Sequence, residues 1–414
     1  MTMNRRSALA TGLALGGAAW LAGPRNAAAQ PGQAIRLGVI TDMSGPFADL
    51  AGQNAVAATR LAAQEAMAAS PGLRVEVLAA DHQNRPDIGS NIARTWFDRE
   101  GVDALVDVPA SSAALAAAGL AREKNKVYLA SSPGTAELTG AQCNANTVQW
   151  TYDTWMLANS TGGAMVRDGG DSWFFVTADY AFGHSMEAEA TRFIQAAGGR
   201  VLGSTRYPFP ATTDFSAFLL RAQASRAKVI GLGFGGVDLV TAVKQAGEFG
   251  IGRRGNQRLA ALILFITEVH ALGLPAAQGL VCSETFYWDL NDRTRAFSAR
   301  LKQGFGTPAP TMVHAGCYAA TLHYLKAAVA MGVGAAKASG AEAVARMKAM
   351  PTDDDAFGPG SIRIDGRKIH PAYLLQVKTP EESRGPWDYY KLLQTTPAEQ
   401  AFRPLGEGGC PLVR

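Results

Sequence analysis

Short apolar runs alternate with longer stretches of helical periodicity along most of the chain. Residues 35–40 form a nearly continuous apolar run, which is typical of a strand buried on both faces. A loop over residues 41–52 follows, and the alanine-rich stretch after it spaces its apolar residues as a helix does. Strand, loop and helix in this order are the first half of a βαβ unit, whose loop lies where open α/β proteins bind small ligands. The same loop is equally consistent with a turn that binds nothing.

This alternation continues in two series, the second of which begins near Thr151 with a helix over residues 155–166. The further strands that we predict are residues 75–79, 102–108, 127–130, 172–177, 200–207, 228–234, 259–266 and 279–286. Strands that alternate with helices predict a doubly wound parallel sheet. We therefore expect two α/β domains of similar design, with loops rich in Ser, Gly and Thr meeting at one sheet edge.

The chain becomes mainly helical after residue 289. We expect helices over residues 293–304, 311–331 and 341–350, and then a hairpin of residues 360–365 and 373–377. The remaining tail is rich in Pro and aromatic residues, and we expect it to wrap around the surface.

The first thirty residues have a different composition. Arg5 and Arg6 precede a short apolar core over residues 8–22, and the segment ends in Ala27, Ala28 and Ala29. This order is that of a secretory signal peptide, and the paired arginines indicate the twin-arginine route. We predict cleavage after Ala29 and a periplasmic location.

The overall composition places few further limits on function. The 414 residues are 47% hydrophobic and 18% charged, which suits a globular protein with room for two domains. Removal of the signal peptide takes away three arginines and no acid, so the formal charge falls from +4 to +1. No basic cluster is interleaved with aromatic residues, so we expect no nucleic-acid partner.

Four cysteines remain in the exported chain, and three pairings of four cysteines are possible. Cys282 and Cys317 lie in apolar stretches that suit buried free thiols. Cys143 and Cys410 lie in polar, turn-rich segments, and we favour a disulfide between these two, which would hold the C-terminal tail.

Motifs for catalysis or metal binding are weak. The glycines of the segment 231–236 fit G-x-G-x-x-G, but a strand entering a ligand loop explains them as well as a dinucleotide site does. The acidic run 353–355 resembles a calcium loop until Phe357 and Ile364, which stand where oxygen ligands belong. The histidines form no metal motif, and no nucleophile is paired with a base. We expect no cofactor, no metal and no catalytic activity.

Aromatic residues recur at the ends of the predicted strands: Phe47, Tyr180, Phe182, Phe234, Phe265, Phe286, Tyr287 and Trp288. Such side chains offer a small ligand a large contact area, although packing in the core or at a hinge would also account for them. Asp238 follows a predicted strand and could neutralise a ligand amino group. An acid in a first helical turn is also favoured by the helix dipole.

Several segments occur in a characteristic order: TDMSGPFADLAG, VDVPASSAALA, YLASSPGTAELTG, FVTADYAFGHSME, TDFSAFLLRAQASRAKVIGLGFGGVDLV and FGIGRRG. Through them, over residues 35–378, the chain resembles the periplasmic branched-chain amino-acid-binding proteins of ABC importers, the type I solute-binding family. The resemblance implies two doubly wound α/β lobes joined by three crossovers, with a ligand buried between them. On this sequence, lobe 1 would cover residues 35–150 and 288–352, and lobe 2 residues 151–287 and 353–378. Residues 379–414 would form the tail.

The resemblance also implies positions for the ligand. The loops after the third and fourth strands, which bind the ligand carboxylate in the family, carry Ser111, Ser112, Ser132 and Thr135 here. Together with the candidates from the loops and aromatic positions, the predicted ligand-binding residues are Ser44, Phe47, Ser111, Ser112, Ser132, Thr135, Phe182, Gly235, Asp238, Phe265 and Phe286. Two positions depart from the family: Leu50 replaces a frequent tyrosine, and residues 264–266 lack the acid that holds an ammonium group.

The sequence thus predicts a monomeric, exported solute receptor that closes two lobes on a small carboxylate-bearing ligand and presents it to ABC permease subunits. The ligand could be a branched-chain or other apolar amino acid, an aromatic or aliphatic acid, or an amide. Two alternatives remain open. One is an enzyme that uses the 231–236 loop for a nucleotide, and the other is a ligand sensor for a receptor.

Overall fold

Two parallel sheets form the framework of the chain in this computed structural model, which describes residues 34–252 and 257–414. The predicted signal peptide, residues 1–29, lies outside the described residues. All elements described below belong to one compact unit, Gln33–Arg414. No helix among them is both long enough and apolar enough to span a bilayer.

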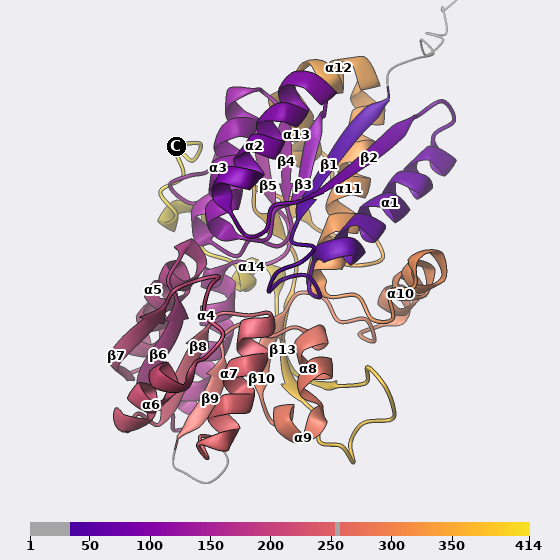
Figure 1. Ribbon diagram of the computed structural model, residues 1–414. Coiled ribbons are helices and arrows are strands. Elements are labelled where there is room, and N and C mark those ends of the chain that lie inside the picture. Colours follow the sequence, from indigo (N-terminus) through magenta and orange to yellow (C-terminus); the bar gives the residue numbers. More distant parts are fainter. Residues whose placement is uncertain (1–33, 253–256) are drawn as a thin grey trace, which may run out of the picture. The chain divides into compact units, whose positions relative to one another are not determined.

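The first sheet has the order β2-β1-β3-β4-β5, and all its strand pairs are parallel. Its strands are β1 (Ile35–Thr41), β2 (Val75–Asp81), β3 (Ala104–Asp107), β4 (Val127–Ala130) and β5 (Thr147–Gln149). β3 and β4 are buried along their whole length, as expected for mainly apolar strands in a parallel sheet, and β3 ends in the buried Asp107. Helices cover the sheet (Figure 1): α1 (Gly52–Ala69) packs with α11 (Met312–Met331), and α2 (Pro86–Thr95) packs with α3 (Ser111–Glu123).

The second sheet repeats this design with the order β7-β6-β8-β9, again all parallel. Its strands are β6 (Ser172–Ala178), β7 (Arg200–Tyr207), β8 (Val229–Gly233) and β9 (Arg258–Ala261). Its helices are α4 (Thr154–Arg167), α5 (Ala181–Ala196), α6 (Ser216–Ala224) and α7 (Val237–Glu248). The prediction of two doubly wound α/β halves is confirmed.

The remaining elements connect or extend these two groups. They are η1 (Trp96–Glu100), η2 (Ala136–Thr139), α8 (Ile266–Leu272), α9 (Leu274–Ala277), β10 (Val281–Glu284), α10 (Asp292–Phe305), α12 (Val333–Ala338), α13 (Gly340–Ala349), β11 (Ser361–Ile362), β12 (Lys368–Ile369), β13 (Ala372–Val377), β14 (Tyr390–Thr396), α14 (Ala398–Ala401) and η3 (Leu405–Glu407). The chain passes between the two groups three times: after β5, after β10 and after α13.

The C-terminal strands pair differently from the sequence prediction. β13 does not form a hairpin with residues 360–365 but pairs antiparallel with both β10 and β14. The short strands β11 and β12 form the hairpin instead. The reason is a tight turn, in which the N–H of Gly366 donates to the carbonyl of Arg363 at 3.0 Å, so the chain turns back within four residues. The prediction that residues 279–286 belong to the second sheet is wrong, because β10 is part of the third sheet, β10-β13-β14, to which the tail supplies β14.

A second difference concerns the predicted strand over residues 259–266. The strand β9 ends at Ala261, and the helix α8 begins at Ile266. The side chain of Glu268 accepts a hydrogen bond from the N–H of Phe265 at 2.8 Å, which satisfies a donor at the start of this helix. An apolar run alone cannot distinguish a strand from a short buried helix.

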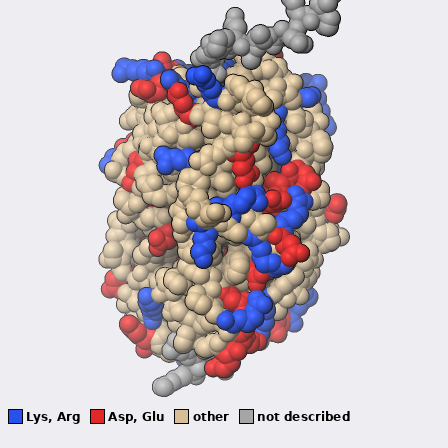
Figure 2. Space-filling view, turned by 90° about the vertical axis from the view of Figure 1, so that its right-hand side faces the viewer, with Lys and Arg blue, Asp and Glu red and all other residues tan. Residues whose placement is uncertain are grey.

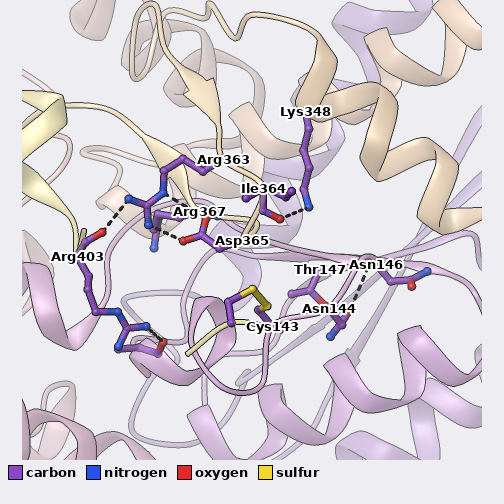
Figure 3. The surroundings of a disulfide bond; sticks show 12 residues. Cys143, Asn144, Asn146, Thr147, Lys348, Arg363, Ile364, Asp365, Arg367 and Arg403 are labelled. Carbon is purple, nitrogen blue, oxygen red and sulfur yellow. Dashed lines mark hydrogen bonds and ion pairs between the residues drawn. A yellow bond between two sulfur atoms is a disulfide. The ribbon is translucent and has the colours of Figure 1, made fainter. Parts of the chain in front are cut away.

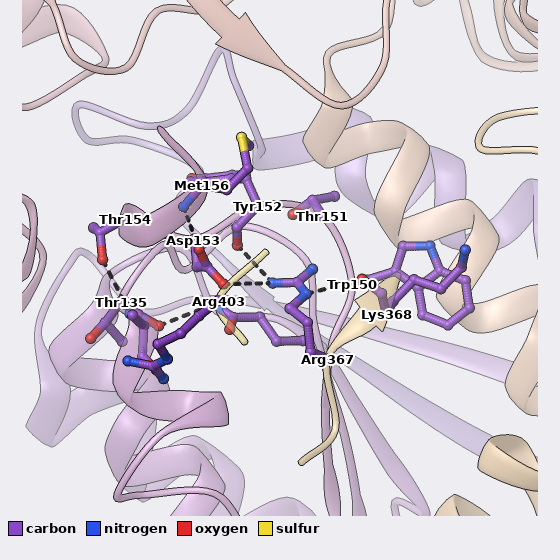
Figure 4. Close-up of polar contacts among 12 residues, drawn as sticks. Thr135, Trp150, Thr151, Tyr152, Asp153, Thr154, Met156, Arg367, Lys368 and Arg403 are labelled. Carbon is purple, nitrogen blue, oxygen red and sulfur yellow. Dashed lines mark hydrogen bonds and ion pairs between the residues drawn. The ribbon is translucent and has the colours of Figure 1, made fainter. Parts of the chain in front are cut away.

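A fully buried arginine joins two of the three passages. Figure 4 shows Arg367 pointing toward the chain around Tyr152, whose carbonyl accepts a hydrogen bond from Nη1 at 3.1 Å. Nη1 also lies 3.6 Å from a carboxylate oxygen of Asp153, and the guanidinium lies over the ring of Phe402 at 4.4 Å. Burial lowers the pKa of Arg367 to about 10, so it remains a cation at neutral pH. These contacts hold the two passages side by side.

A disulfide joins the tail to the first group of elements (Figure 3). It links Cys143 and Cys410, the pair favoured from the sequence, across 267 residues of chain with their Cα atoms 5.5 Å apart. Cys282 and Cys317 are buried free thiols. Close to the disulfide, Arg403 donates to the carbonyl of Ala136 at 2.9 Å. The tail is therefore anchored by covalent and polar contacts and is more than a surface wrap.

The side of the molecule around α10 carries a dense group of charges, and Figure 2 shows acidic and basic side chains gathered there. Arg293 contacts Asp353 at 2.9 Å and Asp355 at 3.0 Å. Arg300 joins Asp355 to Glu65 of α1 at 3.0 and 2.8 Å. These pairs therefore connect α10, α1 and the passage after α13. The acidic run 353–355 thus forms ion pairs with Arg293 and Arg300. In the described part of the chain, no group of His, Cys, Asp and Glu side chains is arranged to hold a metal ion.

Candidate functional site

A narrow cavity lies where loops from both parallel sheets meet. It is lined by Phe47 and Leu50 after β1, Pro109 after β3, Ser132 and Gly134 after β4, Tyr152 after β5, Tyr180 and Phe182 after β6, Gly235 after β8, and Ile263 and Phe265 after β9. Each of these residues follows the carboxyl end of a parallel strand. The cavity therefore lies between the carboxyl edges of the two sheets, which is where open α/β proteins bind ligands.

The room inside this cavity is small. Its free volume is about 20 Å³, which is little more than the roughly 10–15 Å³ that a single buried water molecule needs. Any larger molecule would therefore need the lining side chains, or the two groups of loops, to move apart.

The β1–α1 loop is held in shape by Asp42. One carboxylate oxygen accepts the N–H of Gly45 at 2.7 Å, and the other accepts the N–H of Phe47 at 2.8 Å. Further along the loop, the carbonyl of Leu50 accepts a hydrogen bond at 2.9 Å from the hydroxyl of Thr311, the residue that precedes α11. This bonding places the side chains of Phe47 and Leu50 at the cavity.

Asp107 lies directly beneath the cavity, fully buried at the end of β3. Its backbone has a φ of +81°, in the left-handed region that few non-glycine residues adopt. Its carboxylate accepts the hydroxyl of Thr41 at 2.7 Å and the hydroxyl of Ser132. Burial raises the pKa of Asp107 to about 6, against the opposing effect of these hydrogen bonds. The Ser132 hydroxyl is thus oriented by the buried carboxylate of Asp107.

Aromatic rings connect the loops of the two sheets. Tyr180 stacks on Phe209 with ring centroids 4.4 Å apart, and Phe209 stacks on Phe47 at 5.5 Å. Across the cavity, Tyr152 meets Phe265 edge to face at 6.0 Å. These contacts give the cavity walls a predominantly aromatic surface.

Glu268 lies behind the wall formed by Gly235 and Phe265. One carboxylate oxygen accepts the N–H of Gly236, and the other accepts the N–H of Phe265 at 2.8 Å. Burial raises the pKa of Glu268 to about 8. Its two oxygens are therefore used to fix the loops after β8 and β9.

The chain matches the family model for periplasmic binding proteins over residues 34–385. It is 43% identical to a periplasmic binding protein of Burkholderia mallei, with a TM-score of 0.87 over 92% of this chain and 99% of the other. The chain belongs to the periplasmic binding protein family.

Two further structures are similar to this periplasmic binding protein. A branched-chain amino acid ABC transporter periplasmic ligand-binding protein of Burkholderia xenovorans is 37% identical, with a TM-score of 0.79 over 92% of this chain and all of the other. An ABC transporter solute-binding protein of R. palustris, solved in complex with benzoate, is 20% identical with a TM-score of 0.78 over 92% of this chain and all of the other, which shows a common fold. No curated protein matches the sequence.

Five of the residues predicted from the sequence line the cavity: Phe47, Ser132, Phe182, Gly235 and Phe265. They follow five different strands, three of the second sheet and two of the first. The structure therefore brings together residues that are more than 200 positions apart in the sequence.

The other predicted residues lie outside the lining. Among the hydroxyl residues, Ser44 donates to Asp81 at 2.6 Å, Ser111 accepts the N–H of Thr135 at 3.3 Å, and Ser112 is half-buried on α3. Thr135 caps η2. These residues shape the loops around the cavity without facing it.

Asp238 and Phe286 are also outside the lining. Asp238 accepts the hydroxyl of Tyr207 at 2.8 Å, and burial raises its pKa to about 6. Phe286 packs against Phe297 at 5.7 Å and belongs to the core. As ligand contacts, all of these residues remain predictions.

Sequence reasoning missed several lining residues, notably Pro109, Gly134 and Tyr152. Tyr152 follows a three-residue strand that is too short to show a periodicity. Glu268 was missed as well, although a single acid in the apolar stretch 259–272 was a usable signal.

The glycine-rich segment is explained by close packing. A Cβ atom at Gly231 would lie 2.7 Å from the ring of Phe175, and one at Gly233 would lie 2.5 Å from a methyl group of Thr177. At Gly236 it would lie 2.2 Å from the carbonyl oxygen of Pro46. These glycines therefore allow neighbouring groups to approach, which weakens the hypothesis of a dinucleotide site.

Proposed function

We propose that this chain is the extracytoplasmic substrate-binding component of an ABC importer, which binds a small carboxylate-bearing solute between two closing lobes. The observation that carries the proposal is the cavity between the carboxyl edges of the two sheets. The relatives from Burkholderia mallei and Burkholderia xenovorans, at 43% and 37% identity, support it. An export signal in residues 1–29 and delivery of the solute to membrane permease subunits complete the proposal.

The ligand carboxylate would meet the loops after β3 and β4. Ser132 brings a hydroxyl to the wall, and Gly134 brings backbone to it. The rest of the ligand would meet the aromatic side. A micromolar dissociation constant corresponds to about 8 kcal/mol, which a few such contacts can supply.

Binding would require the two sheets to move relative to each other. The free volume in the cavity is too small for a solute of several carbon atoms, so an open form has to admit the ligand first. The three passages between the two groups of elements provide the hinge for such a movement. The ligand then stabilises the closed form by its greater affinity for it.

Calorimetric titration of the purified, mature protein with a panel of amino acids, amides and organic acids tests this proposal. The variant Ser132→Ala should weaken binding of the tightest carboxylate by about tenfold or more, since a hydrogen bond to a charged group contributes about 1.5–3 kcal/mol. Ser90→Ala is the matched control, because Ser90 is a half-buried serine on α2 that neither lines the cavity nor belongs to the predicted ligand-binding residues. If no carboxylate binds, or if both variants bind like the wild type, the proposed site is wrong.

A ligand sensor for a receptor would use the same cavity. Uptake of the bound solute by cells with and without the gene separates the two functions, because a transport component is required for uptake. A nucleotide-using enzyme would instead be stabilised against heat by NAD or ATP.

A further inference from the structure

The wall of the cavity is uncharged in the described structure. Of its eleven lining residues, five are Phe or Tyr, three are Leu, Ile or Pro, and the others are Ser132, Gly134 and Gly235. A carboxylate can be held by neutral donors such as hydroxyl and backbone N–H groups. An ammonium group, in contrast, needs an acceptor and is favoured by a nearby anion.

The buried acids around the cavity are already bound to groups of the protein. Glu268 lies behind Gly235, where it accepts backbone N–H groups with both of its oxygens. Asp107 lies behind Ser132 and accepts two hydroxyls, and Asp238 accepts the hydroxyl of Tyr207. None of the three is part of the lining. A ligand ammonium group would therefore be buried without a facing carboxylate, which costs free energy.

The aromatic side chains of the wall add a second preference. Tyr152 and Phe265 meet edge to face at 6.0 Å, and Tyr180 lies 6.2 Å from Phe182. An aromatic ligand ring can form edge-to-face contacts with such side chains, which a saturated ring cannot.

We infer that this site selects a flat aromatic monocarboxylate without an amino group. The inference rests on the proposed function and narrows its ligand class. The carboxylate faces Ser132 and Gly134, and the ring lies between the aromatic side chains of the two sheets. Specificity then comes from the absence of a free acid as much as from the presence of the rings.

Two pairs of matched ligands test this inference on the unmodified mature protein. 3-Phenylpropanoate and phenylalanine differ only in the amino group, and benzoate and cyclohexanecarboxylate differ in the flatness of the ring. Calorimetric titration at pH 7 should show 3-phenylpropanoate binding about tenfold or more tightly than phenylalanine, because of the unpaired ammonium group. Benzoate should likewise bind more tightly than cyclohexanecarboxylate.

The outcomes separate this inference from the proposed function. If phenylalanine binds as tightly as 3-phenylpropanoate, the inference is overturned while the binding function stands. Equal affinities for benzoate and cyclohexanecarboxylate overturn the selection for a flat ring. If none of the carboxylates binds, the proposed function fails together with the inference.

Discussion

The backbone N–H of Val237 donates a hydrogen bond to the carbonyl oxygen of Pro46 at 3.0 Å. Pro46 belongs to the loop after β1 of the first sheet, and Val237 is the first residue of α7, which follows β8 of the second sheet. This bond therefore joins the two groups of elements at the edge of the cavity. It can form only when the two loops are as close as they are here, so it would be lost if the two groups of elements moved apart.

Removal of this bond should favour the open form. Val237→Pro deletes the N–H at the first position of a helix, where proline is well tolerated, and the Val237 side chain is exposed. A net hydrogen bond contributes about 0.5–1.5 kcal/mol, so ligand affinity should fall by about two- to tenfold with little change in melting temperature. Calorimetry measures the affinity, and small-angle scattering of the ligand-free protein should report a larger radius of gyration. Val237→Ala keeps the N–H and should behave as the wild type, and equal affinities for both variants would contradict this role of the bond.

A steric test is available one residue earlier. Gly236→Ala would place a Cβ atom 2.2 Å from the carbonyl oxygen of Pro46, so the two loops could not approach as closely. Gly236 also has a φ of +75°, which disfavours alanine on its own account. Gly250, with a φ of +71° and open space around it, is the matched control. Both variants should lose about 1 kcal/mol of stability in urea unfolding, but only Gly236→Ala should bind ligand more weakly. Unchanged affinity in Gly236→Ala would show that closure does not need this contact.

Binding of a carboxylate should depend on the protonation of Asp107. The ionised carboxylate engages the hydrogen of the Ser132 hydroxyl, whereas the protonated form can donate to Ser132 and leave that hydrogen for the ligand. The pKa of Asp107 is raised by burial to about 6 in the free protein, and a bound anion would raise it further. Affinity should therefore increase as the pH falls from 8 to 6, by up to about tenfold for each unit.

The proton itself can be measured in this experiment. Titrations in buffers of different ionisation enthalpy should show uptake of a proton on binding at pH 7.5. In Asp107→Asn the affinity should vary little with pH, because the amide does not titrate. A wild-type affinity that is constant between pH 6 and pH 8, with no proton uptake, would contradict the coupling.

The disulfide should stabilise the tail and, through it, the fold. In the double variant Cys143→Ser, Cys410→Ser the tail loses its covalent anchor, and a disulfide that closes a long loop typically contributes about 2–4 kcal/mol. We expect a lower melting temperature and faster proteolysis after residue 396. The wild type in dithiothreitol should show the same change, and the double variant should be insensitive to the reductant. Equal melting temperatures with and without the disulfide would show that the polar contacts of Arg403 are sufficient.

Much of the architecture could be predicted from local patterns. The buried strands β3 and β4 are mainly apolar because both faces of a parallel sheet are covered by helices. Where the same type of run could form two structures, the prediction was wrong: residues 259–266 divide into β9 and the start of α8, and β10 leaves the second sheet to pair with β13. Strand partners depend on residues nearly 100 positions away, which periodicity does not contain.

The sequence by itself determined the alternation of strands and helices, the position of the loops at the carboxyl ends of the strands, and the polar surroundings of Cys143 and Cys410. These features follow from residues that are neighbours in the chain. Only the tertiary structure decided which loop residues face the cavity: Ser132 does and Ser111 does not. It also brought Tyr152 into the lining and placed Glu268 behind the wall, next to loops that are far from each other in sequence. The physical reason is that a cavity between two sheets is made of side-chain directions from both of them, and these directions are set by packing across the whole fold.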